Sequence, residues 1–399
     1  MPPPPRLLLA PLHWGLGHAA RCLPIAAALE AAAAERGLAL HLHWASDGNA
    51  LALLHRERPG DAHHELPAYG VRYPTRHPLL NVALSGPQML RAIGRETQTV
   101  RGLHERHAFD LVISDHRYGC RVPGVRSLFV THQVHLPVAG LAGRVAQAMQ
   151  EAWVGGFDEV LIPDYATAPR LAGEMSAPPR RMPATYLGPV SRFARAPPPA
   201  QTPQMAQTTR AGDADVAPRD PALVCLLSGP EPARSRLEAL LYERLDRPAT
   251  LIRGTTQPRT SAPPAHFTVH DLLTAGELRA VLAQAPRLIT RPGYTTVMDL
   301  AILGRRAVFV PTPGQPEQAR LGRSLAAGGH GVTVTQEELK VPGALARALG
   351  QLAGLEAASA ERSARGSLRD DAAERGRSLL GDWARREVTR LTLPSVNTL

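Results

Sequence analysis

Two stretches of the chain combine glycine turns with side chains that can move protons or bind anions. The first, "LHWGLGHAARC", carries His13, Gly15, Gly17, His18 and Arg21 between an apolar run and an alanine-rich stretch. The two glycines allow a sharp turn and a close approach to a ligand. The pattern predicts that His18 begins a helix, at the end of a strand, where a neutral imidazole can accept a proton from a hydroxyl group.

A carboxylate that could orient this imidazole ends another strand-like run, "FDLVISD", at Asp115. The carboxyl ends of parallel strands meet at one edge of a sheet, so Asp115 can hold the ring of His18 and raise its basicity. A helix cap or turn explains Asp115 equally well at this stage. His13 competes with His18 for the role of base.

The second stretch is "TRPGYTTVMDLAILGRRAVFVPTPGQPEQAR", residues 290–320. Gly293 is expected to open a helix, so that backbone amides from Tyr294 onward and the hydroxyl groups of Thr295 and Thr296 form an anion site. Asp299 follows on the same helical face, where its carboxylate can accept hydrogen bonds from a ribose diol.

Further polar residues follow neighbouring strands of the second half. Gln315, Glu317 and Gln318 offer donors and acceptors suited to sugar hydroxyl groups. A capped helix and a proline-stiffened turn are the alternative, which we disfavour because phosphate-type and hydroxyl-type groups recur at consecutive strand ends. Ser228 and Gly229, in "LLSGPEPAR", are candidates for a phosphate contact, although an ordinary turn explains them equally well.

Other chemistries are less well supported. "GLGHAA" fits a dinucleotide fingerprint with Asp47 as ribose partner, but Asp47 falls later than the usual spacing. The chain has no G-K-[ST] loop, no G-x-S-x-G and no H-E-x-x-H, and the histidines of "THQVH" have no cysteine nearby. We therefore predict no metal site and no cofactor.

The elements that must position these residues alternate between strands and helices. Residues 6–11 predict a strand, His18–Glu35 a helix, and the alternation restarts after a Pro- and Ala-rich segment at residues 191–221. This predicts two doubly wound parallel sheets of Rossmann-like type. The expected domains are residues 1–190, a linker at 191–221, and residues 222–399 with a helical tail.

Composition limits the class of partner. The chain has 399 residues, of which 44% are apolar and 4% aromatic, with a net charge of +10. That charge suits nucleotide phosphates, and nucleic acid is not predicted because basic and aromatic residues are not interleaved. Three widely spaced cysteines favour a reducing compartment, the cytoplasm. No apolar run approaches the roughly 20 residues of a membrane span, so membrane contact would be peripheral, on the inner face.

The order of the motifs resembles a known family. "GxGHxxR" after the first strand, "DLVISD", "SGPEP" and residues 290–320 are similar to nucleotide-sugar glycosyltransferases of the GT-B fold, in which two Rossmann-like domains face each other across a cleft. Among these the chain is most similar to a bacterial subgroup of family 28 related to MurG, the peptidoglycan N-acetylglucosaminyltransferase. It departs from MurG in the opening turn, where "HWGLGH" replaces a run of adjacent glycines, and in the polar residues after "VPTPG".

The resemblance implies an inverting, metal-independent hexosyl transfer from a nucleoside diphosphate sugar, UDP-linked, to the hydroxyl group of a glycan, lipid or small molecule of the cell envelope. His18 would be the base, assisted by Asp115, and the glycine turn with His13 and Arg21 would take the acceptor. The donor would contact the second half, at Ser228, Gly229, Arg291, Gly293, Tyr294, Thr295, Thr296, Asp299, Gln315, Glu317 and Gln318.

Three alternatives remain from the sequence. A nucleotide-sugar epimerase would use the same fold without an acceptor, and an NAD-dependent dehydrogenase would use the opening glycine turn. A non-catalytic protein would bind the sugar nucleotide without consuming it.

Overall fold

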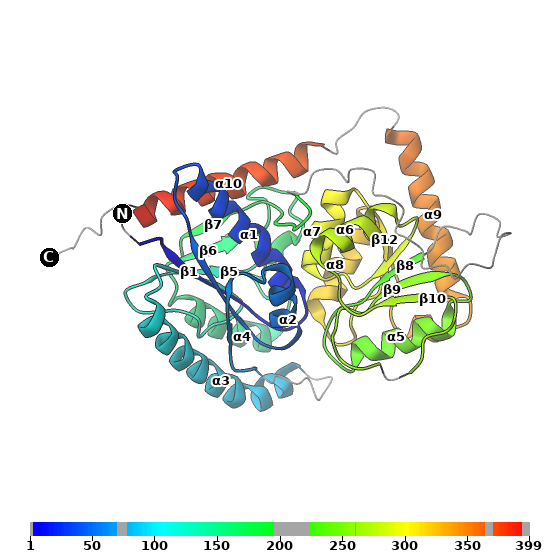
Figure 1. Ribbon diagram of the computed structural model, residues 1–399. Coiled ribbons are helices and arrows are strands. Elements are labelled where there is room, and N and C mark those ends of the chain that lie inside the picture. The colour runs from blue at the N-terminus through cyan, green and yellow to red at the C-terminus, as the bar shows by residue number, and fades with distance from the viewer. Residues whose placement is uncertain (1–2, 70–77, 195–222, 260, 364–369, 393–399) are drawn as a thin grey trace.

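The chain folds around two parallel β-sheets that lie side by side, each covered by helices (Figure 1). The computed structural model describes residues 3–69, 78–194, 223–259, 261–363 and 370–392. Within them the first sheet has seven strands in the order β3-β2-β1-β4-β5-β6-β7, and the second has six in the order β10-β9-β8-β11-β12-β13. The predicted α/β class with two doubly wound sheets is confirmed.

The first half begins with strand and helix as the sequence predicts, since β1 spans residues 6–11 and α1 begins one residue before His18. The strands are β1 (Arg6–Pro11), β2 (His41–Ser46), β3 (Ala62–Glu65), β4 (Leu111–Asp115), β5 (Arg126–Val130), β6 (Glu159–Ile162) and β7 (Ala184–Tyr186). The helices are α1 (Gly17–Ala34), α2 (Gly48–Glu57), α3 (Pro78–His107), α4 (Gly140–Val154) and the short 3-10 helix η1 (Gly173–Ser176).

Both faces of the first sheet are buried, which explains why its central strands are apolar throughout. Leu7 and Leu9 of β1 pack with residues of α1, whereas Leu8 faces the opposite side and packs with Leu103 of α3. Successive residues of a strand point to opposite faces, so the run "LLL" serves two helical layers at once.

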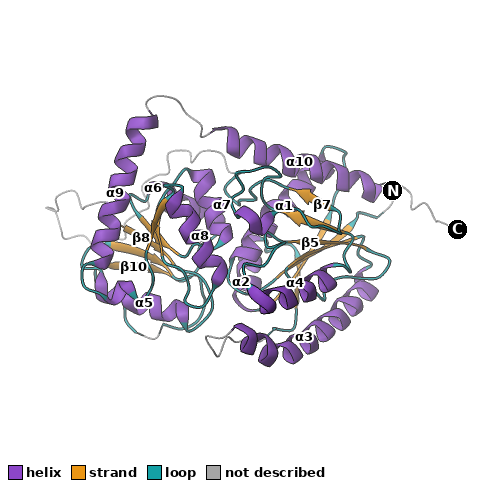
Figure 2. Cartoon of the chain, turned by 180° about the vertical axis from the view of Figure 1, so that it is seen from behind, coloured by secondary structure: helices purple, strands orange, loops and turns teal. Residues whose placement is uncertain are grey.

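The second half repeats this arrangement. Its strands are β8 (Leu223–Leu226), β9 (Ala249–Ile252), β10 (Phe267–His270), β11 (Leu288–Thr290), β12 (Ala307–Phe309) and β13 (Gly331–Thr333). Its helices are α5 (Ala233–Arg244), α6 (Ala275–Gln284), α7 (Tyr294–Leu303), α8 (Pro316–Ala327), the 3-10 helix η2 (Glu338–Lys340) and α9 (Ala344–Ser363). Leucines of α5 and α9 cover one face of the sheet, and those of α6 and α7 cover the other. Figure 2 shows these helices around the strands.

The last helix, α10 (Asp370–Thr392), returns to the first half. It lies along α1 in both views of the chain (Figures 1 and 2), and Trp383, Ala384 and Val388 join the core beneath α1. The sequence placed this tail in the domain that begins at residue 222, and the structure differs because the apolar stripe on α10 packs with α1 of the first half. No helix among the described residues has the length and apolar character to cross a membrane.

Most of the predicted linker lies outside the described residues. Its first residues are described, and Phe193 is buried against the second half, where it packs with Leu282 and Leu300. The boundaries at residues 190 and 222 therefore stay predictions.

Truncation of Trp383 should destabilise the first half. The side chain is 1% exposed, so Trp383→Ala leaves a cavity and is expected to cost about 3–5 kcal/mol. Leu379→Ala, on the same helix but 38% exposed, should cost less than about 1 kcal/mol. Urea unfolding followed by far-UV circular dichroism compares the two variants, and equal losses would show that α10 is not part of this core.

Candidate functional site

The turn between β1 and α1 places His18 at the edge of the first sheet. Gly15 has a φ of +124°, a backbone conformation that residues with a Cβ rarely adopt. Gly17 is the first residue of α1, and the first turn of this helix has no acidic side chain. The turn therefore presents His18 and the free amides of the helix start together.

Asp115 lies directly beside this turn because β4 pairs with β1. Pro11 and Asp115 are partners in the strand register, and the amide of Leu12 donates to the carbonyl of Asp115 at 2.9 Å. Nδ1 of His18 lies 2.7 Å from Oδ1 of Asp115. The structure thus brings together the two residues that the sequence proposed as base and orienting carboxylate.

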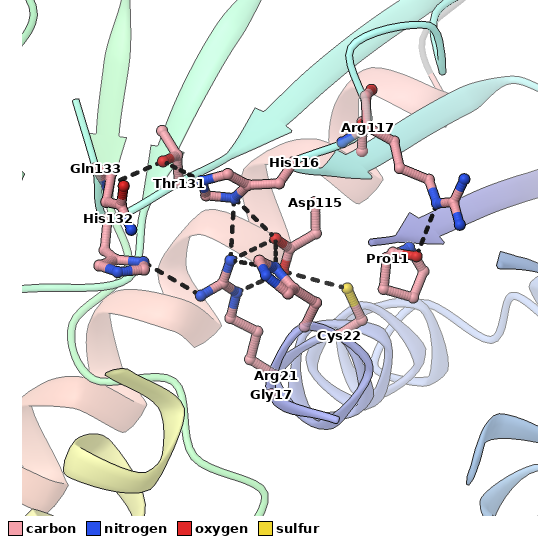
Figure 3. Close-up of polar contacts among 12 residues, drawn as sticks. Pro11, Gly17, Arg21, Cys22, Asp115, His116, Arg117, Thr131, His132 and Gln133 are labelled. Atoms are coloured by element: carbon pink, nitrogen blue, oxygen red, sulfur yellow. Dashed lines mark hydrogen bonds and ion pairs between the residues drawn. The ribbon is translucent and has the colours of Figure 1, made fainter. Parts of the chain in front are cut away.

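Arg21 completes this cluster from one turn further along α1. Its guanidinium donates to both carboxylate oxygens of Asp115 (Figure 3), and the two side chains are only 2% and 0% exposed. His116 also contributes: its Nδ1 lies 3.3 Å from Oδ1 of Asp115, and its Nε2 lies 3.1 Å from the hydroxyl group of Thr131. Arg21 was expected to face the acceptor, but it lies beneath His18 and neutralises Asp115.

Burial and charge set the protonation states of the pair. Burial lowers the pKa of His18 to about 4, although Asp115 partly opposes this and Arg21 adds to it. Burial alone would raise the pKa of Asp115, but Arg21 and His18 hold that pKa well below its ordinary value. At neutral pH the site therefore holds an ionised carboxylate and a neutral imidazole, the state that a general base requires.

Residues of the second half close against this cluster. The hydroxyl group of Thr295, in the first turn of α7, donates to the carbonyl of Gly17 at 3.0 Å. A Cβ on Gly17 would lie 3.0 Å from that hydroxyl oxygen, so a larger residue here would push the Thr295 side chain away. The start of α7 and the start of α1 thus meet at the interface between the halves.

A second contact across the interface links the cluster to the first turn of α8. Nδ1 of His132 accepts from Arg21 at 3.3 Å, and its Nε2 lies 2.7 Å from a carboxylate oxygen of Glu317. The ring of Tyr294 stacks on His132 with centroids 4.0 Å apart, and its hydroxyl group donates to the carbonyl of Pro163 at 2.8 Å. Glu317 and Tyr294, predicted donor residues, therefore both contact the first half.

His13 occupies a different place. Its Nδ1 accepts from the amide of Ala50 at 3.2 Å, and a Cβ on Gly48 would lie 2.5 Å from its Nε2. His13 thus packs under the start of α2, and the structure pairs Asp115 with His18 rather than with His13.

Asp47, the carboxylate that a dinucleotide-binding turn would need, already forms an ion pair within the protein. Arg117, which is 0% exposed, donates to Asp47 and to Glu96, the latter at 2.8 Å. It also donates to the carbonyl of Pro11 at 3.0 Å (Figure 3). Asp47 therefore neutralises a buried arginine, which disfavours its use as a ribose ligand for NAD.

Part of the chain is similar in sequence to known glycosyltransferases. Residues 275–375 match the glycosyltransferase family 28 C-terminal domain. The chain is also 33% identical, over 117 residues, to the UDP-N-acetylglucosamine--N-acetylmuramyl-(pentapeptide) pyrophosphoryl-undecaprenol N-acetylglucosamine transferase of Methylobacterium sp. (strain 4-46). The aligned part is 29% of this chain and 32% of that relative, so the match spans about a third of the relative's length.

Solved structures show the likeness over the whole fold. The glycosyltransferase SnogD from Streptomyces nogalater aligns with a TM-score of 0.56 and 18% identity, over 98% of this chain and 100% of that chain. The spinosyn rhamnosyltransferase SpnG, in complex with thymidine diphosphate, aligns with a TM-score of 0.53 and 16% identity, over 96% of both chains. The chain therefore has the GT-B fold of these glycosyltransferases, and its second half contains the family 28 C-terminal domain.

The sequence predicts that Asp299 contacts a ribose, but in the structure its carboxylate is used inside the protein. The hydroxyl group of Ser191 donates to it at 2.6 Å, Nε of Arg192 lies 3.4 Å away, and the Asp299 side chain is 3% exposed. Burial raises the pKa of Asp299, although Arg192 and Ser191 oppose this. The ribose contact stays a prediction, and the structure shows a link between α7 and the segment that leaves the first half.

Two more donor residues of the MurG-related pattern are engaged with backbone. Arg291 is 0% exposed and donates to the carbonyls of Val310, Pro311 and Ala233, and burial lowers its pKa to about 10. The side-chain carbonyl of Gln318 accepts from the amide of Thr312 at 2.8 Å. Both residues shape the strand ends where a donor would bind.

The remaining predicted donor residues line the edge of the second sheet. Ser228 and Gly229 follow β8, Gly293 precedes α7, Thr296 lies in its first turn, and Gln315 precedes α8. All five are half-buried. A Cβ on Gly15 would lie 3.7 Å from the amide nitrogen of Gly229, so the two glycine turns also meet at the interface.

The sequence analysis missed the contributions of His116 and His132. The signal was their position, because His116 directly follows β4 and His132 lies two residues after the end of its partner strand β5. His18, Asp115 and His116 could together offer ligand atoms to a metal, but Arg21 already neutralises this carboxylate. The expected absence of a catalytic metal stays a prediction.

Replacing His18 with Gln should flatten the pH dependence of stability. The pKa of His18 falls from 6.5 to about 4 on folding. Above pH 6.5 the ring is neutral in both states and costs no stability. As the pH falls from 6.5 toward 4, only the unfolded state gains the proton, so the free energy of unfolding decreases. The full loss corresponds to about 3 kcal/mol. The free energy of unfolding, measured in urea at about pH 7.5 and about pH 4.5, should therefore change less in His18→Gln than in the wild type.

The control is His41→Gln, since His41 is exposed and should leave the wild-type pH dependence unchanged. If both variants lose stability in parallel with the wild type, His18 does not titrate as described.

Proposed function

We propose that this protein transfers a sugar from a nucleoside diphosphate sugar, UDP-linked, to an acceptor hydroxyl group with inversion of the anomeric carbon. The observation that carries the proposal is the pair formed by His18 and Asp115, 2.7 Å apart, opposite the start of α7. This arrangement sets a neutral base against a helix start that can bind a leaving diphosphate.

The base would act through Nε2 of His18. An ionised carboxylate can only accept hydrogen bonds, so the ring nitrogen facing Asp115 carries the hydrogen and Nε2 keeps its lone pair. Nε2 takes the proton of the acceptor hydroxyl group while the acceptor oxygen bonds to the anomeric carbon. The bond from that carbon to the diphosphate oxygen breaks in the same displacement, and Asp115 stabilises the imidazolium that forms.

The leaving diphosphate would be stabilised by the start of α7. This helix has no acidic residue in its first turn, and its first amides follow Gly293. A helix start carries roughly half a positive charge, which favours an anion. With the hydroxyl group of Thr296 added, these groups take the place of a cation, so we propose a reaction without metal or cofactor.

Relatives suggest the donor and the acceptor. The Methylobacterium relative is named as a transferase that uses UDP-N-acetylglucosamine and a pyrophosphoryl-undecaprenol acceptor, whereas SpnG was solved with thymidine diphosphate. We propose UDP as the nucleotide and a hydroxyl-bearing glycan, lipid or small molecule as the acceptor. We also propose a cytoplasmic location, with peripheral contact to the inner face of the membrane.

Loss of the base should abolish transfer without abolishing donor binding. His18→Gln is expected to lower kcat by about 100- to 10,000-fold with little change in KM for the donor. His13→Gln is the matched control, because His13 packs under α2 and should retain kcat within about tenfold. Release of nucleoside diphosphate with a panel of acceptors measures both, and full turnover by His18→Gln would remove the assigned base.

Nucleotide binding should identify the donor site separately. In calorimetric titrations with UDP, GDP, dTDP, ADP and NAD, we expect UDP to bind selectively and Thr296→Val to weaken that binding by about threefold to tenfold, the value of one hydrogen bond. Thr99→Val, on the exposed face of α3, should have no effect. Selective binding of NAD would favour a dehydrogenase, and UDP binding without turnover on any acceptor would favour an epimerase or a binding protein.

A further inference from the structure

A second group of histidines lies in the first half, away from His18. His43 of β2, His64 of β3 and His107 at the end of α3 each place one ring nitrogen within 4.8 Å of the other two. Nδ1 of His43 and Nε2 of His64 are 3.0 Å apart. The three rings thus present their nitrogens to one another from three separate elements.

Strand register explains why two of these rings share a face. His43 pairs with Ala62 and Ala45 pairs with His64, so His43 and His64 alternate in step on one side of the sheet. The end of α3 reaches the same side. Phe109 packs edge-on against His43, with centroids 5.1 Å apart, within the cluster of apolar side chains under α3.

The backbone around the third histidine, His107, is fixed by contacts with Arg6. Nη1 of Arg6 donates to the carbonyl of His107 at 2.9 Å, and the amide of Arg6 donates to the carboxylate of Asp110 at 2.8 Å. The centroids of His43 and His107 lie 4.7 Å apart. These contacts tie the last turn of α3 to the beginning of β1, at the edge of the sheet opposite to Asp115.

We propose a binding site for a divalent transition-metal ion, most favourably zinc, formed by His43, His64 and His107. This site is separate from the cluster around His18 and Asp115. Imidazole nitrogens suit Zn²⁺, Cu²⁺ and Ni²⁺, whereas Mg²⁺ and Ca²⁺ require oxygen ligands that this group lacks. A tetrahedral zinc ion lies about 2.0–2.1 Å from each nitrogen, which places the nitrogens about 3.4 Å apart. In the structure one pair of nitrogens lies 3.0 Å apart, and the three chosen ring nitrogens all lie within 4.8 Å of one another, so ring rotations would bring them to that value.

The ion would replace the contact between two rings and join three elements. His43 and His64 now share a hydrogen bond, in which one of the two facing nitrogens carries the hydrogen. On metal binding that ring would hold its hydrogen on its other nitrogen instead, so that both facing nitrogens offer a lone pair to the metal. Because β3 is the outermost strand of its sheet, the ion would fasten this edge to β2 and to α3. His64 and His107 are half-buried, so one position remains open to a water molecule, as in other three-ligand zinc sites.

One neighbouring charge opposes the ion. The guanidinium of Arg6 lies beside the cluster through its bond to His107, and no carboxylate belongs to the group of three. We therefore expect binding that is selective among metals but weaker than at a site with a negatively charged ligand.

The experiment is a calorimetric titration of the full chain, without an affinity tag and stripped of metal, with ZnCl₂ and separately with MgCl₂. The wild type should bind one zinc ion at this site and no magnesium. His64→Gln and His107→Gln should each weaken zinc binding by at least about tenfold. Loss of a residue that only hydrogen-bonds to a metal ligand typically lowers metal affinity by about that factor, and loss of a ligand itself should cost at least as much. Zinc should raise the Tm of the wild type but not that of the double variant.

Two control variants test other histidine groups. His55→Gln with His63→Gln removes a neighbouring pair whose ring centroids are 3.9 Å apart, and His116→Gln removes a ring of the catalytic cluster. Both should bind zinc as the wild type does. The proposal is overturned if zinc affinity is unchanged in the His64→Gln and His107→Gln double variant, or if the loss follows either control.

Discussion

The buried carboxylate of Asp115 is the constraint on which the rest of the site depends. It is 0% exposed, receives both arms of the Arg21 guanidinium and holds Nδ1 of His18. Two opposite charges removed from water are costly to separate, because the partner left behind has no solvent to stabilise it. The pair therefore fixes α1 against the end of β4, and His18 takes its position from that attachment.

From Asp115 the polar contacts continue into the second half of the chain. Arg21 donates to His132, and His132 faces Glu317 across the interface, with Tyr294 stacked against its ring. The first turn of α8, which carries Glu317, is thus connected to His18 through His132 and Arg21. Any movement that separates the halves must break the contact between His132 and Glu317 and the one between Thr295 and Gly17. In this arrangement His18 and the first turn of α8 are coupled physically.

Much of the fold could be predicted from local patterns, and the site only in part. The run "RLLLAP" and the glycine turn identify β1 and the start of α1 because burial on both faces of a parallel sheet leaves an apolar strand. The edge strand "AHHE" has no such pattern. The pairing of His18 with Asp115 followed from strand ends meeting at one edge, but the engagement of Asp299 with Ser191 and Arg192 did not. That contact joins residues 108 positions apart, and no local spacing encodes it.

The return of α10 to the first half affects how the protein can be made. Trp383, Ala384 and Val388 belong to the core under α1, yet ribosomes synthesise them after all of β8 to β13. During translation the core of the first half therefore stays incomplete, with part of its apolar surface uncovered, until the second half has been synthesised. Domains generally fold in order of synthesis, and here that order is interrupted. A nascent chain of this protein therefore exposes a binding surface for chaperones until α10 emerges.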